Sequence, residues 1–327
     1  MLPRKSDPVA ETGKYTRNSP APKLKIAGPF NKKNKNGYQN VTGYLFISPF
    51  IIGFIALTLY PIVYSFFLSF TDFDLLGTPN FIGLGNYERM FTGDEKFWIS
   101  LKVTFTYALT AVPLRLVFAL AVAMLLNRVV EFVGLYRTLL YLPSIIGGSI
   151  AISILWRQLF GNDGALNSLL GFFGISGHSW LGDPATALWT LVALYGWQFG
   201  SSMLIFLAGL RNIPKDYYEA ASIDGAGAWS QFVRITLPLL TPVILFNLVM
   251  QTIQGFMAFT PSYVVTQGGP MDSTLLYVLY MFRRAFEFFD MGYASAMAWV
   301  MLVIIGILTA IIFKSSKHWV HYEQDEK

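Results

Sequence analysis

The chain contains 327 residues, of which 54% are hydrophobic and only 13% are charged, and its formal net charge is +5. An average soluble domain has about 25% charged residues, so this composition is typical of a membrane protein and not of a soluble enzyme. Cysteine is absent from the sequence, which excludes disulfides, thiolate metal sites and cysteine nucleophiles.

Residues 1–42 form a polar, basic segment that is rich in Lys, Pro, Asn, Gly and Ser. Such a composition cannot bury enough apolar surface to fold alone, so we expect a disordered cytoplasmic tail. Two roles stay open: the tail either guides membrane topology with some attraction to lipid, or serves as a docking arm for a partner. A secretory signal is not expected, because the first apolar run is too long.

Six apolar segments are long enough to cross a hydrocarbon core about 30 Å thick, which takes about 20 helical residues. They lack the alternating polarity of barrel strands, so we expect helices and an all-α polytopic membrane fold. The transmembrane domain covers 43–313, and a cytoplasmic tail covers 314–327. The predicted spans are 44–70, 103–126, 138–160, 185–209, 237–260 and 291–313.

Lysine and arginine are distributed unequally between the two sides of these spans. The richer side carries the N-terminal tail, Arg128, Arg137, Arg211, Lys215, Arg234, Lys314, Lys317 and Lys327. The poorer side carries Arg89, Lys96, Arg283 and Arg284. The positive-inside rule therefore places both termini and the loop 210–236 in the cytoplasm. Because the basic residues lie where topology requires them, the net charge does not indicate nucleic-acid binding.

Arg115 lies in the middle of the second predicted span, and no Asp or Glu falls inside any of the six spans to pair with it. A charge at that depth costs about 3 kcal/mol or more. We expect Arg115 to face a cavity, carbonyl groups, another subunit or an anionic substrate. A structural role and contact with substrate or a gate both stay open.

Polar residues recur on single faces of three spans. In the fifth span they follow the spacing i, i+4, i+7, which places them on one helix face. Each set alone fits helix packing, but together they favour a polar path near the centre of the bilayer, and amide and indole groups suit a hydroxyl-rich ligand. The sets are Asn247, Gln251 and Gln254; Ser149, Ser153 and Trp156; and Trp197, Gln198, Ser201 and Ser202.

The stretch 275–289 follows the last external turn, Thr266–Pro270. It is aromatic and contains Arg283 and Arg284. Two structures fit it: a short interfacial helix at the outer mouth, or a longer start of the sixth span.

The loop 210–236 is a polar interruption between the fourth and fifth spans. Pro214 suits the first turn of a helix and Asn212 the preceding cap, so we expect a helix up to Ile223. Asp224-Gly225 supplies the stop, and a second short helix should run from Ala226 towards Arg234. Such a helix-turn-helix, standing outside the membrane, is suited to insertion into a groove of a partner.

This loop carries a family resemblance. Glu219-Ala220-Ala221, then Gly225 and then Ile235-Thr236-Leu237-Pro238 resemble, in residue and spacing, the EAA signature of ABC importer permeases. Nearly all of 43–313 is similar to the carbohydrate-uptake branch, and most similar to the maltose-permease-like subunit of the permease pair. Thr260 departs from it, since sugar permeases commonly have Asp after Phe259. The supporting segments are Ser69–Asp72, Gly83–Tyr87, Gly268–Pro270 and Gly292–Ala296.

The resemblance implies the type I ABC importer fold in a bacterial inner membrane. It also implies four kinds of partner: a second homologous permease, two ATPase subunits, an extracytoplasmic solute-binding protein and the lipid bilayer. Coupling to the ATPase is assigned to Glu219, Ala220, Ala221, Asp224 and Gly225. ATP and Mg would bind to the partner ATPases, because the sequence has no phosphate-binding loop of the form GxxxxGKS/T.

We therefore expect a transport subunit and not an enzyme, with an oligosaccharide as cargo. Its expected substrate path comprises Asn247, Gln251, Gln254, Trp197, Gln198, Ser153, Trp156 and Arg115. Arg115, Arg283 and Arg284 also allow an acidic oligosaccharide, such as a uronate polymer fragment.

Three other kinds of protein are alternatives to an oligosaccharide permease. An ABC permease for another solute, such as glycerol phosphates, shares every motif. A secondary transporter would often place paired acidic residues in its spans, which this sequence lacks. A membrane enzyme is disfavoured, because no Ser/His/Asp or metal constellation occurs near the spans.

Overall fold

A computed structural model describes residues 35–128 and 132–321. The predicted tail therefore lies largely outside the described part, as do residues 322–327. The chain divides into two compact units, Met1–Leu59 and Tyr60–Lys327. The first unit contains the helix α1 (Lys35–Phe54), which begins inside the stretch assigned to the tail, and the π-helical turn η1 (Ile55–Leu59).

The described side chains of the first unit are almost all exposed and largely apolar. Phe46 is 79% exposed and Leu57 is 80% exposed. The helical run Gly43–Leu68 is long and apolar enough to cross a membrane. An exposed helix of this kind needs lipid or another protein surface around it.

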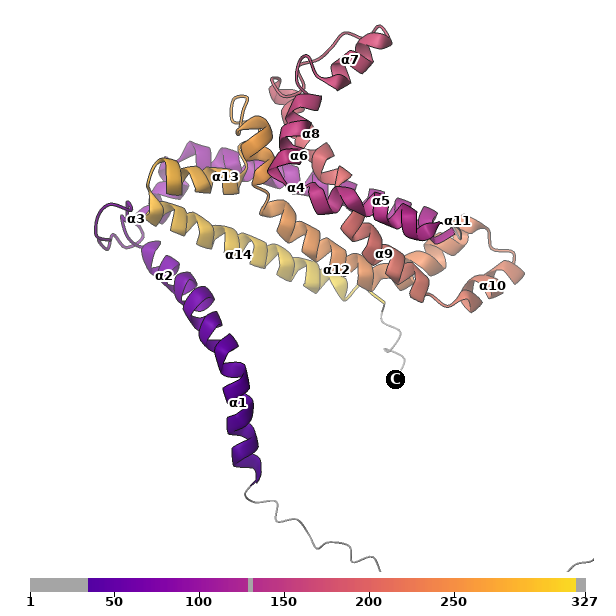
Figure 1. Ribbon diagram of the computed structural model, residues 1–327, viewed down its shortest axis with the longest axis horizontal. Helices are drawn as coiled ribbons and strands as arrows, with labels where there is room; N and C mark the ends of the chain where they lie inside the picture. Colours follow the sequence, from indigo (N-terminus) through magenta and orange to yellow (C-terminus); the bar gives the residue numbers. More distant parts are fainter. Residues whose placement is uncertain (1–34, 129–131, 322–327) are drawn as a thin grey trace, which may run out of the picture. The chain divides into compact units, whose positions relative to one another are not determined.

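The second unit is all-helical over its described residues (Figure 1). Its longer helices are α2 (Tyr60–Leu68), α4 (Glu95–Arg128), α5 (Val133–Ile146), α6 (Ile150–Leu159), α7 (Ala165–Phe172), α8 (Pro184–Trp197), α9 (Gly200–Asn212), α10 (Lys215–Ile223), α12 (Leu237–Phe256) and α14 (Met291–Ser316). Its short helices and π-helical turns are α3 (Gly85–Glu88), η2 (Arg89–Gly93), α11 (Ala228–Gln231), η3 (Phe232–Thr236), η4 (Ser262–Thr266), α13 (Tyr277–Phe282) and η5 (Arg283–Glu287).

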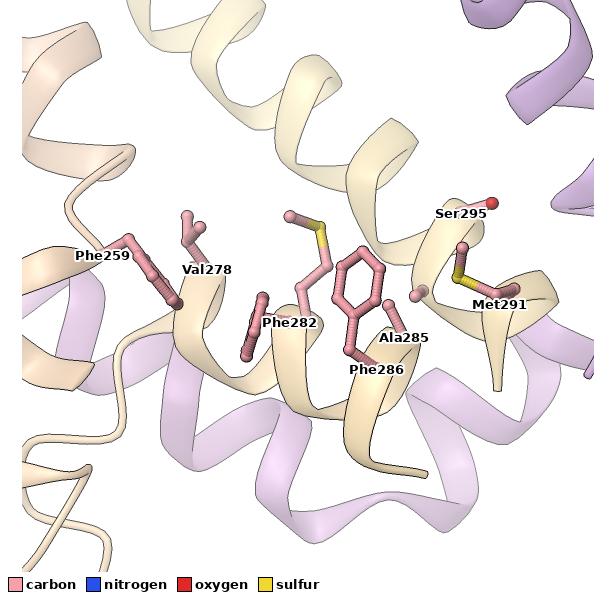
Figure 2. A pocket seen from close by; sticks show the side chains of 9 residues that line it. Phe259, Val278, Phe282, Ala285, Phe286, Met291 and Ser295 are labelled. Atoms are coloured by element: carbon pink, nitrogen blue, oxygen red, sulfur yellow. The ribbon is translucent and has the colours of Figure 1, made fainter. Parts of the chain in front are cut away.

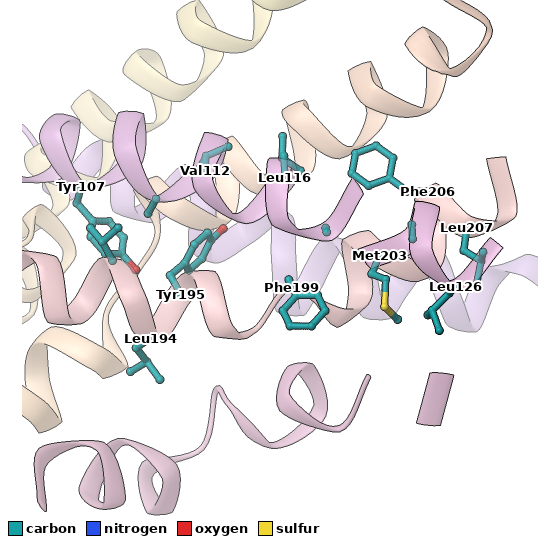
Figure 3. Close-up of a cluster of buried hydrophobic side chains, with 14 of the residues drawn as sticks. Tyr107, Val112, Leu116, Leu126, Leu194, Tyr195, Phe199, Met203, Phe206 and Leu207 are labelled. Atoms are coloured by element: carbon teal, nitrogen blue, oxygen red, sulfur yellow. The ribbon is translucent and has the colours of Figure 1, made fainter. Parts of the chain in front are cut away.

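Helix α4 is the central element of this unit, with contacts to α8, α9, α12 and α13. Its 34 residues correspond to about 50 Å at a rise of about 1.5 Å per residue. Asp94 fixes its start, because the Asp94 carboxylate accepts a hydrogen bond from the Phe97 N–H at 3.2 Å. Figure 3 shows the hydrophobic cluster that fills the space around α4, including Tyr107, Val112, Leu116, Tyr195, Phe199, Met203 and Phe206.

The described residues contain up to six candidate membrane spans, in agreement with the sequence. Four single helical runs are long and apolar enough, and two bent helix pairs bring the number to six if each pair is one span. The helix that contains the predicted fifth span begins before 237, because α11, η3 and α12 form one helical run, Ala228–Phe256. The helix that leaves the polar loop is thus continuous with the span.

The predicted third span, 138–160, is not one helix. Helices α5 and α6 meet at an angle of 95°. A β-carbon at Gly147 would overlap the Gln198 side chain and the Pro143 carbonyl, so the chain passes close to its neighbours there. Ser149 then caps α6, its Oγ accepting a hydrogen bond from the Ile152 N–H at 3.3 Å. The fourth span is also bent, by 43° between α8 and α9.

The aromatic stretch 275–289 forms a short helix of its own. Helix α13 and the turn η5 end before Phe289, whose φ of 57° lies in the left-handed region, and α14 begins at Met291. Of the two structures left open by the sequence, the separate short helix is therefore correct. In Figure 1, α3 and α13 lie at one end of the second unit and α10 and α11 at the opposite end.

A charged network ties that first end together. The Asp94 carboxylate accepts hydrogen bonds from the hydroxyls of Tyr280 and Tyr293, and Arg284 pairs with it at 3.1 Å. Burial raises the pKa of Asp94, but the two tyrosine hydrogen bonds and the charge of Arg284 outweigh burial and hold the pKa below its ordinary value. The network therefore joins the start of α4 to α13, η5 and α14.

We expect Asp94→Asn to lower the free energy of unfolding at neutral pH by about 1.5–3 kcal/mol, because charged hydrogen bonds are lost. Since the folded-state pKa is depressed, this stability is present above the unfolded pKa of about 4 and is lost as the pH falls through the folded pKa. Thermal unfolding of the purified protein at a series of pH values would measure it. Asp163→Asn, at an exposed position, is the matched control. A wild-type advantage that persists well below the folded pKa would contradict the assignment.

Gly292 marks the closest approach of α14 to the segment after α2. A β-carbon there would overlap the backbone oxygen of Thr71, whereas one at Gly306 in the same helix would have open space within 4 Å. We expect Gly292→Ala to lower the free energy of unfolding by about 1–3 kcal/mol through overpacking, and Gly306→Ala to be neutral or slightly stabilising. Equal melting temperatures for the two variants would show that the close contact between Gly292 and Thr71 does not contribute to stability.

Candidate functional site

The polar loop forms a helix that ends in a tight, hydrogen-bonded turn. Helix α10 stops at Ile223, and Gly225 takes a φ of 79°. The N–H of Ala226 donates to the Ala221 carbonyl at 2.8 Å, and the N–H of Gly225 donates to the Ser222 carbonyl at 3.1 Å. This pair of bonds is a Schellman motif, which favours glycine because other residues are strained in the left-handed region.

Two details of the predicted loop are wrong. Asn212 does not cap α10 but is the last residue of α9, and Pro214 occupies the cap position without a capping side chain. The second helix begins at Ala228, not at Ala226, and leads through η3 into α12. Gly227 acts as the cap of α11 with extended backbone, so the turn between the helices is longer than expected.

The predicted coupling residues lie on the surface. Glu219, Ala220, Asp224 and Gly225 are exposed, and Ala221 is half-buried. Two apolar residues beside them escaped the sequence-based prediction: Ile223 is 87% exposed and Trp229 is 75% exposed. Exposed residues of this size, close together in the chain, are typical of a surface that binds another protein.

The loop is also fastened to the base of the fifth span. The hydroxyls of Tyr218 in α10 and Thr236 in η3 are hydrogen bonded at 3.0 Å. Gln231 donates from Nε2 to the Ala226 carbonyl and to Ser222, both at 3.0 Å. Behind these contacts lies a cavity of about 300 Å³ that extends to Arg128 at the end of α4. These contacts join α10 to the helical run that continues into α12.

Arg115 lies at the wall of a polar cavity of about 440 Å³ that is open to the surface of the helical unit. Only 4% of Arg115 is exposed, its Nη2 donates to Ser201 at 3.1 Å, and its guanidinium lies 4.5 Å from the ring centre of Tyr195. The remaining lining comes from α4, α5, α8, α12 and the segment after α12. It includes Tyr107, Ser144, Gln198, Gln254, Phe259 and Thr260.

The polar stripe of the fifth span divides into two environments. Asn247 and Gln251 are buried, with 0% and 3% exposure, whereas Gln254 is exposed and faces the Arg115 cavity. The Tyr195 hydroxyl lies 3.0 Å from Oε1 of Gln251 and 3.1 Å from its backbone carbonyl, so Gln251 holds α12 to α8. Asn247 donates to the Val243 carbonyl of its own helix at 3.2 Å.

The two predicted tryptophans lie on a different hollow. Trp156 and Trp197 have ring centres 5.8 Å apart and line an open groove of about 700 Å³ at α6. Ser153 is fully buried, and its hydroxyl donates a hydrogen bond to the Ser149 carbonyl. The structure thus brings Arg115, Gln198 and Gln254 together on one cavity and places the tryptophans on another.

Sequence reasoning missed Tyr107, Tyr195 and Ser144 in the Arg115 cavity. A tyrosine inside an apolar span gives no periodic signal, and the contact of Ser144 with Gln198 depends on the break between α5 and α6. A further, apolar hollow of about 470 Å³ lies beside the Arg115 cavity, and Phe259 lines both (Figure 2). Its other walls are Phe282 and Phe286 of the α13–η5 segment and the start of α14.

A scan against family models matches residues 37–320 to the family described as the binding-protein-dependent transport system inner membrane component. The chain belongs to this family. It is accordingly a multi-pass membrane subunit of a transport system, with the all-helical fold of type I ABC importer permeases.

Several curated proteins are similar over most of their length. A probable ABC transporter permease protein of Bacillus subtilis, YesP, is 62% identical over 88% of this chain and 94% of its own. The lactose transport system permease protein LacF of Rhizobium radiobacter is 35% identical over 86% of this chain and 95% of its own. The arabinooligosaccharides transport system permease protein AraP of Bacillus subtilis is 35% identical over 84% and 88%.

Among solved structures, the crystal structure of a bacterial alginate ABC transporter in complex with an alginate pentasaccharide-bound periplasmic protein contains a similar chain. The TM-score is 0.76 at 21% identity, over 86% of this chain and 96% of that one. A second structure, of a transporter involved in the import of alginate, gives 0.73 at 21% identity over 86% and 97%. At this identity the likeness establishes the fold.

We expect Gln251→Ala to lower the free energy of unfolding by about 1–3 kcal/mol, since it leaves a cavity and removes a partner of Tyr195. The matched change Gln254→Ala, one turn further on and exposed, should stay within about 0.5 kcal/mol of wild type. Thermal unfolding of the two purified variants would measure the difference. If Gln254→Ala is destabilised, or if Gln251→Ala is as stable as the wild type, the assignment of Gln251 to packing and of Gln254 to the cavity is wrong.

Proposed function

We propose that the chain is one of two permease subunits of an ATP-driven importer that carries an oligosaccharide into a bacterial cell. The observation that carries this proposal is α10 with its Gly225 turn, exposed at one end of the helical unit and matched to the EAA spacing. Family membership and relatives named for lactose and arabinooligosaccharides support a carbohydrate cargo.

The loop is proposed to dock on a partner ATPase. Glu219 and Asp224 offer exposed carboxylates, the small residues Ala220, Ala221 and Gly225 allow close approach, and the apolar residues beside them supply buried area on binding. Closure of the ATPases on ATP would pull on α10. The Tyr218–Thr236 contact and the continuous helix to Phe256 then pass the movement to the membrane region.

ATP and Mg are proposed to bind to two partner ATPase subunits, so this chain would couple hydrolysis to transport without performing it. The long exposed apolar run Gly43–Leu68 supports contact with lipid and with a second, homologous permease. An extracytoplasmic solute-binding protein would deliver the cargo, in keeping with the family description.

Both termini are proposed to lie in the cytoplasm, on the same side as α10. The basic residues at the ends of α4, α9 and α14 support this orientation through the positive-inside rule. The Asp94 network and α13 would then face the outside, where the binding protein arrives.

The coupling role is tested by replacing Gly225 with valine. A β-branched residue at a φ of 79° is strained by about 1–2 kcal/mol or more, so the exposed turn should change shape. In proteoliposomes that contain the complete transporter, we expect ATP-dependent uptake of sugar to fall at least tenfold. The amounts of inserted chain and of copurified second permease should stay the same.

Gly227→Val is the matched control, because Gly227 lies in the same turn with a φ of −71°, which valine tolerates, and with open space around it. Normal uptake by Gly225→Val, or equal losses in both variants, would refute the role of the turn in coupling. Failure of any ATPase subunit to copurify with the wild-type chain would refute the proposed importer.

A further inference from the structure

The Arg115 cavity contains a positive charge that nothing in the described chain neutralises. Arginine stays protonated in proteins. Among residues 35–128 and 132–321, no carboxylate forms an ion pair with Arg115. Its polar contact is a neutral serine, and its Nε is buried without a hydrogen-bond partner.

A buried charge is stabilised by an opposite charge or by a full set of hydrogen bonds. The ring of Tyr195 supplies part of the stabilisation through its π-face. Within the described part of the chain, the Tyr107 hydroxyl, on the same cavity, also has no hydrogen-bond partner. A cation without a counter-charge and a hydroxyl without a hydrogen-bond partner, on one cavity, form a place where an anion with several acceptor oxygens fits.

We propose that Arg115 forms a carboxylate subsite, and that the cargo of this permease includes oligosaccharides with a uronate residue. This inference rests on the proposed import function and specifies its substrate class. Arginine suits carboxylates because its planar N–H groups match the two oxygens. Gln254 and Gln198 on the same cavity suit the hydroxyl groups of the sugar.

The other two arginines that the sequence suggested for an acidic cargo are already engaged. Arg284 pairs with Asp94 and with Asp290. Arg283 donates from Nη2 to the Gln267 carbonyl at 2.9 Å and lies 3.6 Å from a carboxylate oxygen of Glu287. The proposed recognition of negative charge therefore belongs to Arg115 and not to the outer end of the helical unit.

The test uses the complete transporter in proteoliposomes, with its second permease, ATPases and binding protein. The outside solution contains a defined panel: di- to tetrasaccharides of galacturonate and mannuronate, and neutral maltose and arabinose oligomers of the same lengths. Mass spectrometry of the lumen, with and without ATP, reports what is imported. For the wild type we expect uronate-containing sugars in the lumen.

Arg115→Gln removes the charge at nearly constant volume. We expect uronate uptake to fall at least tenfold more than the uptake of any neutral sugar that the wild type imports, and Arg115→Lys to restore part of the uronate uptake. Arg157→Gln is the matched control, since Arg157 is an exposed arginine of α6 that does not line the cavity. It should import uronates like the wild type.

A second variant tests the charge without touching Arg115. Thr260 is an uncharged residue of the same cavity, so Thr260→Asp should supply the missing anion and lower uronate uptake at least tenfold. Thr260→Asn matches its size without the charge and should have a much smaller effect. This pair stays informative if Arg115→Gln does not fold.

Each outcome decides for or against the subsite. Import of neutral sugars alone by the wild type, or full uronate uptake by Arg115→Gln, overturns it and leaves the import function standing. Loss of the second permease from Arg115→Gln preparations, with Thr260→Asp importing uronates normally, assigns Arg115 to an acid of the partner and also overturns it. If no sugar accumulates with ATP, the proposed import function itself fails.

Discussion

The helical run from Ala228 to Phe256 is the constraint on which the rest of the structure depends. It carries Thr236, which contacts the exposed loop, near one end and Gln254, which faces the Arg115 cavity, near the other. Its 29 residues correspond to about 43 Å of helix. The run is helical throughout, although η3 is π-helical and Pro238 and Pro242 donate no backbone hydrogen bond.

The packing around this run determines what can follow its movement. Gln251 fastens α12 to α8 through Tyr195, and a β-carbon at Gly255 would lie 3.0 Å from the side chain of Val112 in α4. The same Tyr195 ring lies under Arg115. A rotation or shift of α12 would therefore change the environment of the buried cation. Close packing makes interiors of this kind switch between discrete arrangements, and not deform continuously.

The number, type and order of the spans could be predicted because hydrophobic length alone determines them. The 95° break between α5 and α6 does not follow from apolar length, and Pro143 and Gly147-Gly148, which could have signalled it, are also tolerated in unbroken membrane helices. It takes the three-dimensional approach of Gly147 to Gln198 to explain it. In the same way, helical spacing placed Gln251 and Gln254 on one helix face. Only the contact with α8 in the structure shows that Gln251 is packed, whereas Gln254 lines the cavity. The spacing of polar residues along a helix does not show which of two hollows they face, so the sequence could not separate Trp156 and Trp197 from Arg115.

A buried charge without a counter-charge, such as that of Arg115, points to a functional residue that no sequence motif identifies. The sequence allowed carbonyl groups, a partner or a substrate as the counterpart of this charge, and the described chain supplies a serine hydroxyl and an aromatic ring. Neither contact carries negative charge, so the electrostatic cost of burial is only partly offset. A negative charge that arrives from outside the subunit would offset the rest, and the polar cavity beside Arg115 is the space into which that charge would come. Since the cavity wall includes Gln254 of α12, the proposed anion and the proposed movement of α12 would act on the same side chains.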